Sequence, residues 1–203
     1  MAFQCPLPPT PVLETPRLVL RPPRMQDVPA IQRDFPDWEL VKHLHAGIPW
    51  PYPADGAETN MRECLARLER GEACCWTITV KHGDNACIGR IELKPDLANQ
   101  DMRGFWLARS HWGQGLMTEA ADAVTSFAFQ ELGWPFLYLN NAVDNVRSHR
   151  IKEKQGATLI GVKPHAYVCG ELMRETWLLT REDWLARRKY ASSARPGEGR
   201  DPG

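Results

Sequence analysis

Apolar residues recur along this chain with two different periods, and the changes between them predict an order of strands and helices. Alternating or continuous apolar runs of strand length predict seven strands, near 17–21, 75–80, 87–93, 104–108, 136–139, 157–168 and 174–179. Apolar positions three and four residues apart predict five helices, near 26–35, 38–45, 56–70, 115–132 and 147–155. In the fourth helix they form one stripe, which predicts core packing: Leu116, Ala120, Ala123, Val124, Phe127 and Leu132.

The order of these elements predicts the fold class. The early strands are expected to pair antiparallel, and they lead into a strand-helix-strand-helix-strand end. This predicts an α/β (α+β) fold with a mixed, twisted, mostly antiparallel sheet and helices on both faces. Residues 13–190 are expected to form a single domain, between a flexible proline-rich segment at 1–12 and a flexible tail at 191–203.

A glycine-containing turn joins the strand at 104–108 to the helix at 115–132, with the sequence Trp112-Gly113-Gln114-Gly115-Leu116-Met117-Thr118. Glycines free the backbone for close approach, and the first amides of a helix lack partners within it. Together they suit a pyrophosphate. A P-loop would need Gly-Lys-Ser/Thr, and a dinucleotide fold a third glycine, so both are excluded. The motif alone fits a tight turn without a ligand equally well.

A second motif follows the strand at 136–139 and runs from Asn145 through Ser148 to Gly156, a typical helix stop. The two motifs, Trp-Gly-x-Gly-x-x-Thr-Glu-Ala and Asn-x-x-Ser-x-x-hydrophobic-x-Glu-Lys-x-Gly, resemble those of the GNAT superfamily of acetyl-CoA-dependent N-acetyltransferases. Within it they resemble the ribosomal-protein N-terminal acetyltransferase (Rim-type) group. The resemblance extends from about Leu13 to Trp184. It implies an enzyme that transfers acetyl from acetyl-CoA to a primary amine in a ternary complex, preferably the N-terminal α-amine of a protein or peptide.

The resemblance also implies where the co-substrate lies. Two parallel strands, ending near Ala108 and at 136–139, splay apart, and the pantetheine arm occupies the gap like an extra strand. Asn145 is expected to hydrogen-bond the pantetheine, and Lys152 and Lys154 to lie by the adenosine end near the surface. The full expected site is Trp106, Leu107, Ala108, Trp112, Gly113, Gln114, Gly115, Leu116, Met117, Thr118, Asn140, Asn145, Ser148, Lys152 and Lys154.

The catalytic residues are less well marked. By resemblance Ser148 is the proton donor to the leaving thiolate, although Asn and Ser at a helix start also serve as caps. Relatives carry a glutamate as general base at two positions, which Met102 and Asn140 occupy here. Glu92 is the best remaining carboxylate, although its place in an alternating strand also fits an exposed bystander. Asp101 and His149 are weaker candidates.

The missing glutamates favour a weakly basic acceptor. An α-amine has a pKa of about 7.7–8.0 against about 10.4 for lysine, so roughly a tenth of it is neutral at pH 7. The acceptor is expected at a proline-aromatic segment containing Asp37, Glu39, Trp50 and Tyr52. As an alternative, the two acidic residues would be favoured at the start of a helix, and the two aromatic residues could cover the core. Two alternatives stay open: acetylation of a small amine, such as an antibiotic or amino-acid conjugate, and a CoA-binding module with little catalysis.

Composition and charge narrow the classes of function that remain. A net charge of +0 and a pI of about 7.0 give no basic field for nucleic acid. No apolar run has the roughly twenty residues of a membrane helix, and the first residues do not resemble a signal peptide. Six cysteines show neither Cys-x-x-Cys nor a Cys/His metal spacing. We expect a cytoplasmic monomer or homodimer with free thiols and no metal, whose partners are acetyl-CoA and an amine acceptor.

Overall fold

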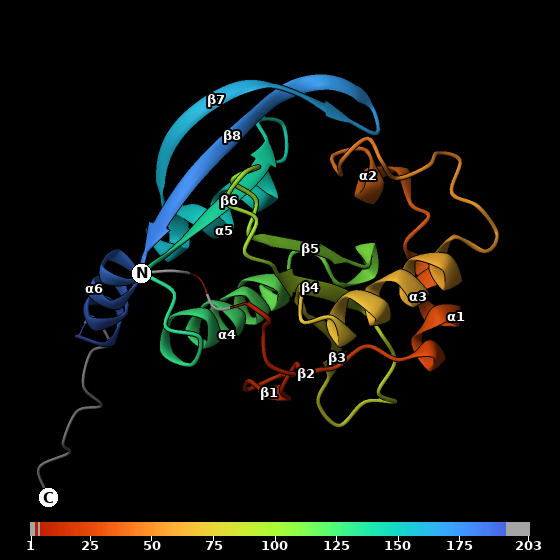
Figure 1. The fold of residues 1–203 in the computed structure, drawn as a ribbon, viewed down its shortest axis with the longest axis horizontal. Coiled ribbons are helices and arrows are strands. Elements are labelled where there is room, and N and C mark those ends of the chain that lie inside the picture. The colour runs from red at the N-terminus through yellow and green to blue at the C-terminus, as the bar shows by residue number, and fades with distance from the viewer. Residues whose placement is uncertain (1–2, 4, 194–203) are drawn as a thin grey trace, which may run out of the picture.

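The computed structural model describes residue 3 and residues 5–193 (Figure 1). The elements are β1 (Leu13–Glu14), β2 (Leu18–Arg21), η1 (Met25–Asp27), α1 (Val28–Asp34), α2 (Trp38–Val41), α3 (Gly56–Glu69), β3 (Cys74–Val80), β4 (Gly89–Leu93), β5 (Arg103–Leu107), η2 (Arg109–His111), α4 (Leu116–Gln130), β6 (Phe136–Ala142), α5 (Val146–Gln155), β7 (Thr158–Tyr167), β8 (Gly170–Thr180) and α6 (Arg181–Ser193).

The strands form two sheets. Five antiparallel strands follow the order β1-β2-β3-β4-β5, and a second antiparallel sheet has the order β6-β8-β7. The sheets meet where the backbone N–H of Met102 donates to the carbonyl of Tyr138 at 2.9 Å. Beyond this contact β5 and β6 belong to different sheets. The α/β class and the mostly antiparallel pairing are confirmed, and the central splay is the gap between these two sheets.

The main core lies between the first sheet and α4. The predicted apolar stripe of α4 faces it, with Leu116, Ala120, Val124 and Phe127 buried and the other two members packed at its margin. A smaller core lies where α1, α2 and α3 pack together, around Ile31. The two cores fix the elements that surround the gap between the sheets.

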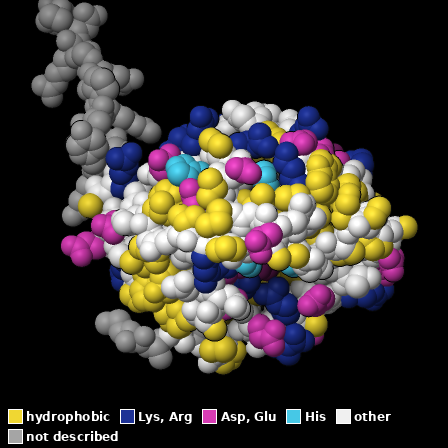
Figure 2. All heavy atoms as spheres, turned by 90° about the horizontal axis from the view of Figure 1, so that it is seen from above, with side chains coloured by type: hydrophobic (Ala, Val, Ile, Leu, Met, Phe, Trp, Pro, Cys, Tyr) yellow, Lys and Arg dark blue, Asp and Glu magenta, His cyan; other side chains and the backbone are white. Residues whose placement is uncertain are grey.

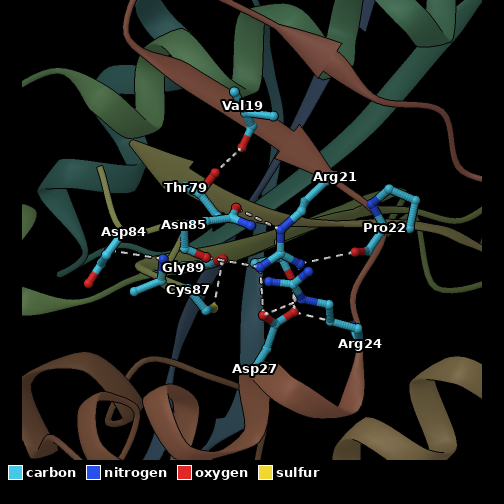
Figure 3. Close-up of polar contacts among 12 residues, drawn as sticks. Val19, Arg21, Pro22, Arg24, Asp27, Thr79, Asp84, Asn85, Cys87 and Gly89 are labelled. Carbon is cyan, nitrogen blue, oxygen red and sulfur yellow. Dashed lines mark hydrogen bonds and ion pairs between the residues drawn. The ribbon is translucent and has the colours of Figure 1, made fainter. Parts of the chain in front are cut away.

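A buried ion pair ties β2 to η1 and to the β3–β4 loop (Figure 3). The Arg21 guanidinium donates to both carboxylate oxygens of Asp27, at 2.6 and 2.9 Å, and its Nε donates to Asn85 at 3.0 Å. Thr77 Oγ1 donates to the same carboxylate at 2.9 Å. Burial raises the pKa of Asp27, but the hydrogen bonds from Arg21 and Thr77 outweigh it, and the pKa is lowered. Asp27 is therefore a charged, fully partnered group only 3% exposed.

The proline-rich start is packed against the domain. Leu7 is 5% exposed and its N–H donates to the carbonyl of Gly71 at 2.8 Å. The indole N–H of Trp76 donates to the carbonyl of Pro11 at 2.7 Å. The expectation of a flexible segment is wrong for residues 5–12, because a buried side chain and these hydrogen bonds hold it along β3. Of the tail expected at 191–203, residues 194–203 lie outside the described residues.

Two helices differ from the expected pattern. The helix expected at 38–45 ends at Val41, because the next residues bond instead to the β7–β8 turn, where the Val168 N–H donates to Leu44 O at 3.0 Å. Helix α6 was not among the expected helices. Thr180 and Asp183 cap it reciprocally: Thr180 Oγ1 donates to the Asp183 carboxylate, and the Asp183 N–H donates back to Oγ1. A Thr-x-x-Asp capping signal was therefore present in the sequence.

The surface carries charges of both signs. Figure 2 shows the face seen from above, on which Lys and Arg side chains alternate with Asp and Glu among hydrophobic ones. Of the helices that the structure describes, none is both long and apolar enough to cross a membrane. Within the same residues no group of three or more His, Cys, Asp or Glu side chains is arranged to hold a metal ion.

Candidate active site

A groove of about 290 Å³ brings the two sequence motifs together. The end of β5 and the glycine turn form one part of it, the start of α5 forms another, and α2 borders it at a third. Most residues expected at acetyl-CoA line this groove: Trp106, Leu107, Trp112, Gly113, Gly115, Leu116, Met117, Thr118, Asn145, Ser148 and Lys154. Motifs that lie some thirty residues apart in the sequence thus form one continuous surface.

The glycine turn has the backbone geometry of a phosphate cradle. Gly113 and Gly115 have φ angles of +77° and +75°, in the left-handed region where side chains are strained. An added Cβ at Gly113 would meet nothing within 4 Å, so the space beside this glycine is open. Helix α4 begins at Leu116, and the amides of its first turn have no partner within the helix. These residues fit the pyrophosphate of a nucleotide.

Arg17 holds this turn from outside. Its Nη1 donates to the carbonyl of Gln114 at 2.9 Å, and its Nε donates to the Glu119 carboxylate at 2.7 Å. Thr15 Oγ1 donates to the same carboxylate at 2.5 Å. The turn is thereby fixed to the loop between β1 and β2. Gln114 does not line the groove, and its backbone carbonyl is the atom that Arg17 holds.

The start of α5 combines a cap with a buried hydroxyl. Asn145 Oδ1 accepts from the Ser148 N–H at 3.2 Å, so Asn145 is the N-cap of α5. Ser148 is 6% exposed, and its Oγ accepts from Lys152 Nζ at 2.8 Å. Ser148 does not cap the helix with its side chain. Its hydroxyl therefore remains available at the groove.

Lys152 corrects one expectation about the co-substrate. It was expected near the surface by the adenosine end, but it is 1% exposed and does not line the groove. Its position on α5 faces the inside of the molecule, next to Ser148. Lys154, two residues on, points to the other side of the helix and does line the groove. Of these two lysines, only Lys154 lies where a cation near the adenosine end was expected.

Two further residues of the expected co-substrate site lie outside the groove. Ala108 is buried, and its N–H donates to the carbonyl of Ile88 at 2.8 Å. Asn140 Nδ2 donates to the carbonyl of Gln100 at 2.6 Å. Asn140 thus joins β6 to the loop before β5, on the side where the two sheets meet.

Neither candidate position supplies a carboxylate base. Glu92 lies on β4 outside the groove and forms an ion pair with Arg67 at 3.3 Å. Met102, at one of the two positions where the resemblance implies a glutamate base, is fully buried at the junction of the sheets. The structure places Glu92 against α3 and outside the groove.

One of the four residues expected at the acceptor reaches the groove. Glu39 lines it, and its carboxylate accepts from Lys42 Nζ at 2.8 Å, a hydrogen bond that lowers the pKa of Glu39. Asp37 lies outside and caps α2 by accepting from the Glu39 N–H at 2.8 Å. Trp50 is exposed, and its ring packs against that of a neighbouring tryptophan. Tyr52 packs against the smaller core. These three support the segment and do not line the groove.

Several residues that line the groove were not expected from the sequence. His43 lines the groove and follows Glu39 by four residues, a spacing that would place both on one face of the helix expected at 38–45 and could have revealed it. Burial, together with the charge of Lys42, lowers the pKa of His43, so its imidazole is neutral at pH 7. The Arg147 guanidinium carbon lies 3.8 Å from the centroid of the Trp112 ring, where it forms one rim of the groove.

Comparisons with known proteins agree with this geometry. A family model described as the acetyltransferase (GNAT) domain matches residues 17–158. The chain belongs to this family. It is accordingly an N-acetyltransferase that uses acetyl-CoA.

Relatives extend the comparison. The chain is 28% identical over 155 residues to the uncharacterized N-acetyltransferase YoaA of Bacillus subtilis (strain 168), covering 75% of this chain and 85% of YoaA. Among solved structures, RimJ of Mycobacterium smegmatis in complex with CoA-disulfide has a TM-score of 0.73 at 19% identity, covering 90% of this chain and 93% of RimJ. The ribosomal L7/L12 alpha-N-protein acetyltransferase RimL, in complex with coenzyme A, has a TM-score of 0.71 at 19% identity, covering 84% and 98%. At this identity the two structures show a shared fold.

Proposed function

We propose that this protein transfers the acetyl group of acetyl-CoA to the N-terminal α-amine of a protein or peptide. The observation that carries the proposal is the single groove that joins the left-handed glycine turn, Ser148, Glu39 of α2 and His43 just after that helix. The preference for an α-amine follows from the absence of a glutamate at Met102 and Asn140, since an α-amine needs less help to lose its proton. The RimL neighbour, which its name describes as an alpha-N-protein acetyltransferase, agrees with this choice.

In the proposed mechanism each part of the groove has one task. The amides at the start of α4 bind the pyrophosphate, and Lys154 adds a positive charge on the facing helix. Backbone N–H groups in the gap between the sheets stabilise the oxyanion. Ser148 Oγ–H donates a proton to the leaving sulfur.

The α2 side serves the acceptor. The Glu39 carboxylate attracts an ammonium group, and the neutral His43 imidazole or water takes up the amine proton as the amine attacks. A carboxylate base is not required in this scheme. The geometry of α2 thereby determines which amines can approach.

A thiol-release screen tests the proposal. The purified protein is mixed with acetyl-CoA and one of three acceptors: a lysine-free hexapeptide with a free N-terminal serine, the same peptide N-acetylated with one internal lysine, and a panel of aminoglycosides and amino acids. Free thiol and the acetylated product are measured. We expect release with the first peptide and little with the second. Release with the small amines alone would assign the second acceptor class, and CoA binding without release from any acceptor would indicate a binding module.

A further inference from the structure

Lys152 is a buried amine bound to the same hydroxyl that faces the groove. Its Nζ donates to Ser148 Oγ at 2.8 Å and to the Ser148 carbonyl at 3.2 Å. Among the described residues it takes part in no ion pair. A fully buried amine without a carboxylate partner is costly to a fold, so its presence calls for a purpose beyond packing.

The surroundings of Lys152 keep its proton labile. Burial is the main cause that lowers the pKa of Lys152 well below its usual value, and the buried Arg103 guanidinium on β5 lowers it further. Glu175 on β8 and Asp101 before β5 act in the opposite direction, more weakly. The ring of Phe105, which lines the groove, lies 5.8 Å from Nζ. Lys152 thus sits directly beneath the groove, separated from it by Ser148 and an aromatic ring.

We propose that Lys152 is a positioning residue for acetyl transfer: it orients the Ser148 hydroxyl and replaces the proton that Ser148 gives to the leaving sulfur. This inference rests on the proposed function. A hydroxyl has one hydrogen and two lone pairs. Because Lys152 donates to one lone pair, the Ser148 hydrogen is free to point into the groove.

The amine nitrogen forms a bond to the acetyl carbon, and the C–S bond breaks with its electron pair going to sulfur. The Ser148 proton moves to that sulfur, and a proton of the Lys152 ammonium moves to Ser148 Oγ. The proton lost by the amine goes to His43 or water. After product release, Lys152 regains a proton from water through Ser148.

The test compares Lys152→Met, Ser148→Ala and the double variant, with the serine-initiated hexapeptide as acceptor. Methionine is unbranched like lysine, slightly shorter and without its charge, so the variant is expected to fold and to melt no lower than the parent, because a buried amine is removed. We expect kcat to fall about tenfold while KM for acetyl-CoA stays within about twofold. In the Ser148→Ala background, Lys152→Met should have no further effect, because the two residues act in one path. Lys163→Met, at an exposed position on β7, is the control and should match the parent.

The pH profile gives a second measurement. In the parent, kcat should fall on the alkaline side as Lys152 loses its proton, and this limb should be missing in Lys152→Met. Three outcomes would overturn the inference while the proposed function stands. They are a parent-like kcat in Lys152→Met, a kcat in the double variant that falls by the product of the two single effects, and a lower melting temperature without a kinetic effect. A parent that releases no thiol with any acceptor would instead remove the proposed function, and this inference with it.

Discussion

Arg17 and Glu119 are joined twice: the Arg17 backbone N–H donates to Glu119 Oε1 at 2.9 Å, and its Nε donates to Oε2 at 2.7 Å. This pair fixes the loop between β1 and β2 to the first turn of α4. Since Arg17 also holds the carbonyl of Gln114, the same contacts set the shape of the glycine turn. The affinity for CoA should therefore depend on a residue that does not line the groove.

We predict that Glu119→Gln weakens CoA binding by about five- to tenfold, because the amide cannot hold Arg17 by charge and two acceptor oxygens. Calorimetric titration with CoA measures the effect. Glu131→Gln, at the exposed C-terminal end of the same helix, is the control and should leave the affinity unchanged. Equal affinities in both variants would mean that the turn keeps its shape without the pair.

The glycine turn itself is predicted to need its left-handed backbone. Gly115→Val should reduce CoA affinity by more than about tenfold, because a β-branched residue at a φ of +75° costs of order 1–3 kcal/mol and displaces the turn. Gly133→Val is a matched control, since Gly133 has a φ of +66° but lies outside the groove. It should lose stability and keep its CoA affinity. A calorimetric titration that finds Gly115→Val unaffected would contradict the cradle.

Ser148→Ala should lower kcat by about ten- to a hundredfold, with a smaller change in KM for acetyl-CoA, because in the proposed mechanism the hydroxyl acts on the leaving sulfur and not in binding. Steady-state kinetics with the serine-initiated peptide measures both constants. The Asn145 cap is unaffected by this change, since it accepts from the backbone N–H of Ser148. Turnover within about twofold of the parent would leave Ser148 with no role in proton transfer.

Substitutions of Glu92 and of His43 should have different effects on activity. Glu92→Gln should keep most of the activity, because its carboxylate binds Arg67 outside the groove. His43→Gln should lower kcat/KM at neutral pH. Because the pKa of His43 is lowered, its basic form is already present at pH 7 and is lost only as the pH falls through this lowered pKa. Loss of turnover in Glu92→Gln with intact CoA binding would instead identify Glu92 as the base.

Asp27 is predicted to make folding sensitive to acid. Its pKa is lowered in the folded protein, so its contribution to stability is present above the pKa of the unfolded chain and is lost as the pH falls through the lower, folded value. Asp27→Asn should lower the free energy of unfolding by about 3–5 kcal/mol, because it leaves the buried Arg21 without its counter-charge. Urea denaturation at pH 7 and at pH 3 measures both effects. The difference between parent and variant should shrink at the lower pH.

Local patterns in the sequence carried much of this structure. The apolar stripe of α4 and the strand-to-helix glycine turn follow from periodicity and from backbone requirements of neighbouring residues. The pairing of Arg17 with Glu119 joins residues 102 positions apart, and nothing in either local segment indicates it. Charged contacts of this kind depend on how elements pack, which single-sequence patterns do not specify.

The burial of Lys152 illustrates the same limit at the site. The resemblance placed Lys152 near the surface, and lysine is in general almost never fully buried. The choice between inside and outside depended on the register of α5 against β5 and β8, which places Lys152 inward and Lys154 toward the groove. The capping role of Asn145, by contrast, was open to prediction because it needs only its own helix.

The hydrogen bonds between the segment after α2 and the β7–β8 turn support only one end of the groove. The two ends are therefore attached to different parts of the fold. The end proposed for the acceptor is bonded to the tip of the β7–β8 hairpin, and the end proposed for the phosphates is bonded to Arg17 in the β1–β2 loop. Insertions or deletions in the hairpin can therefore reshape the entrance for the amine without disturbing the nucleotide end. An enzyme built in this way can acquire a new acceptor by changing the length of one turn.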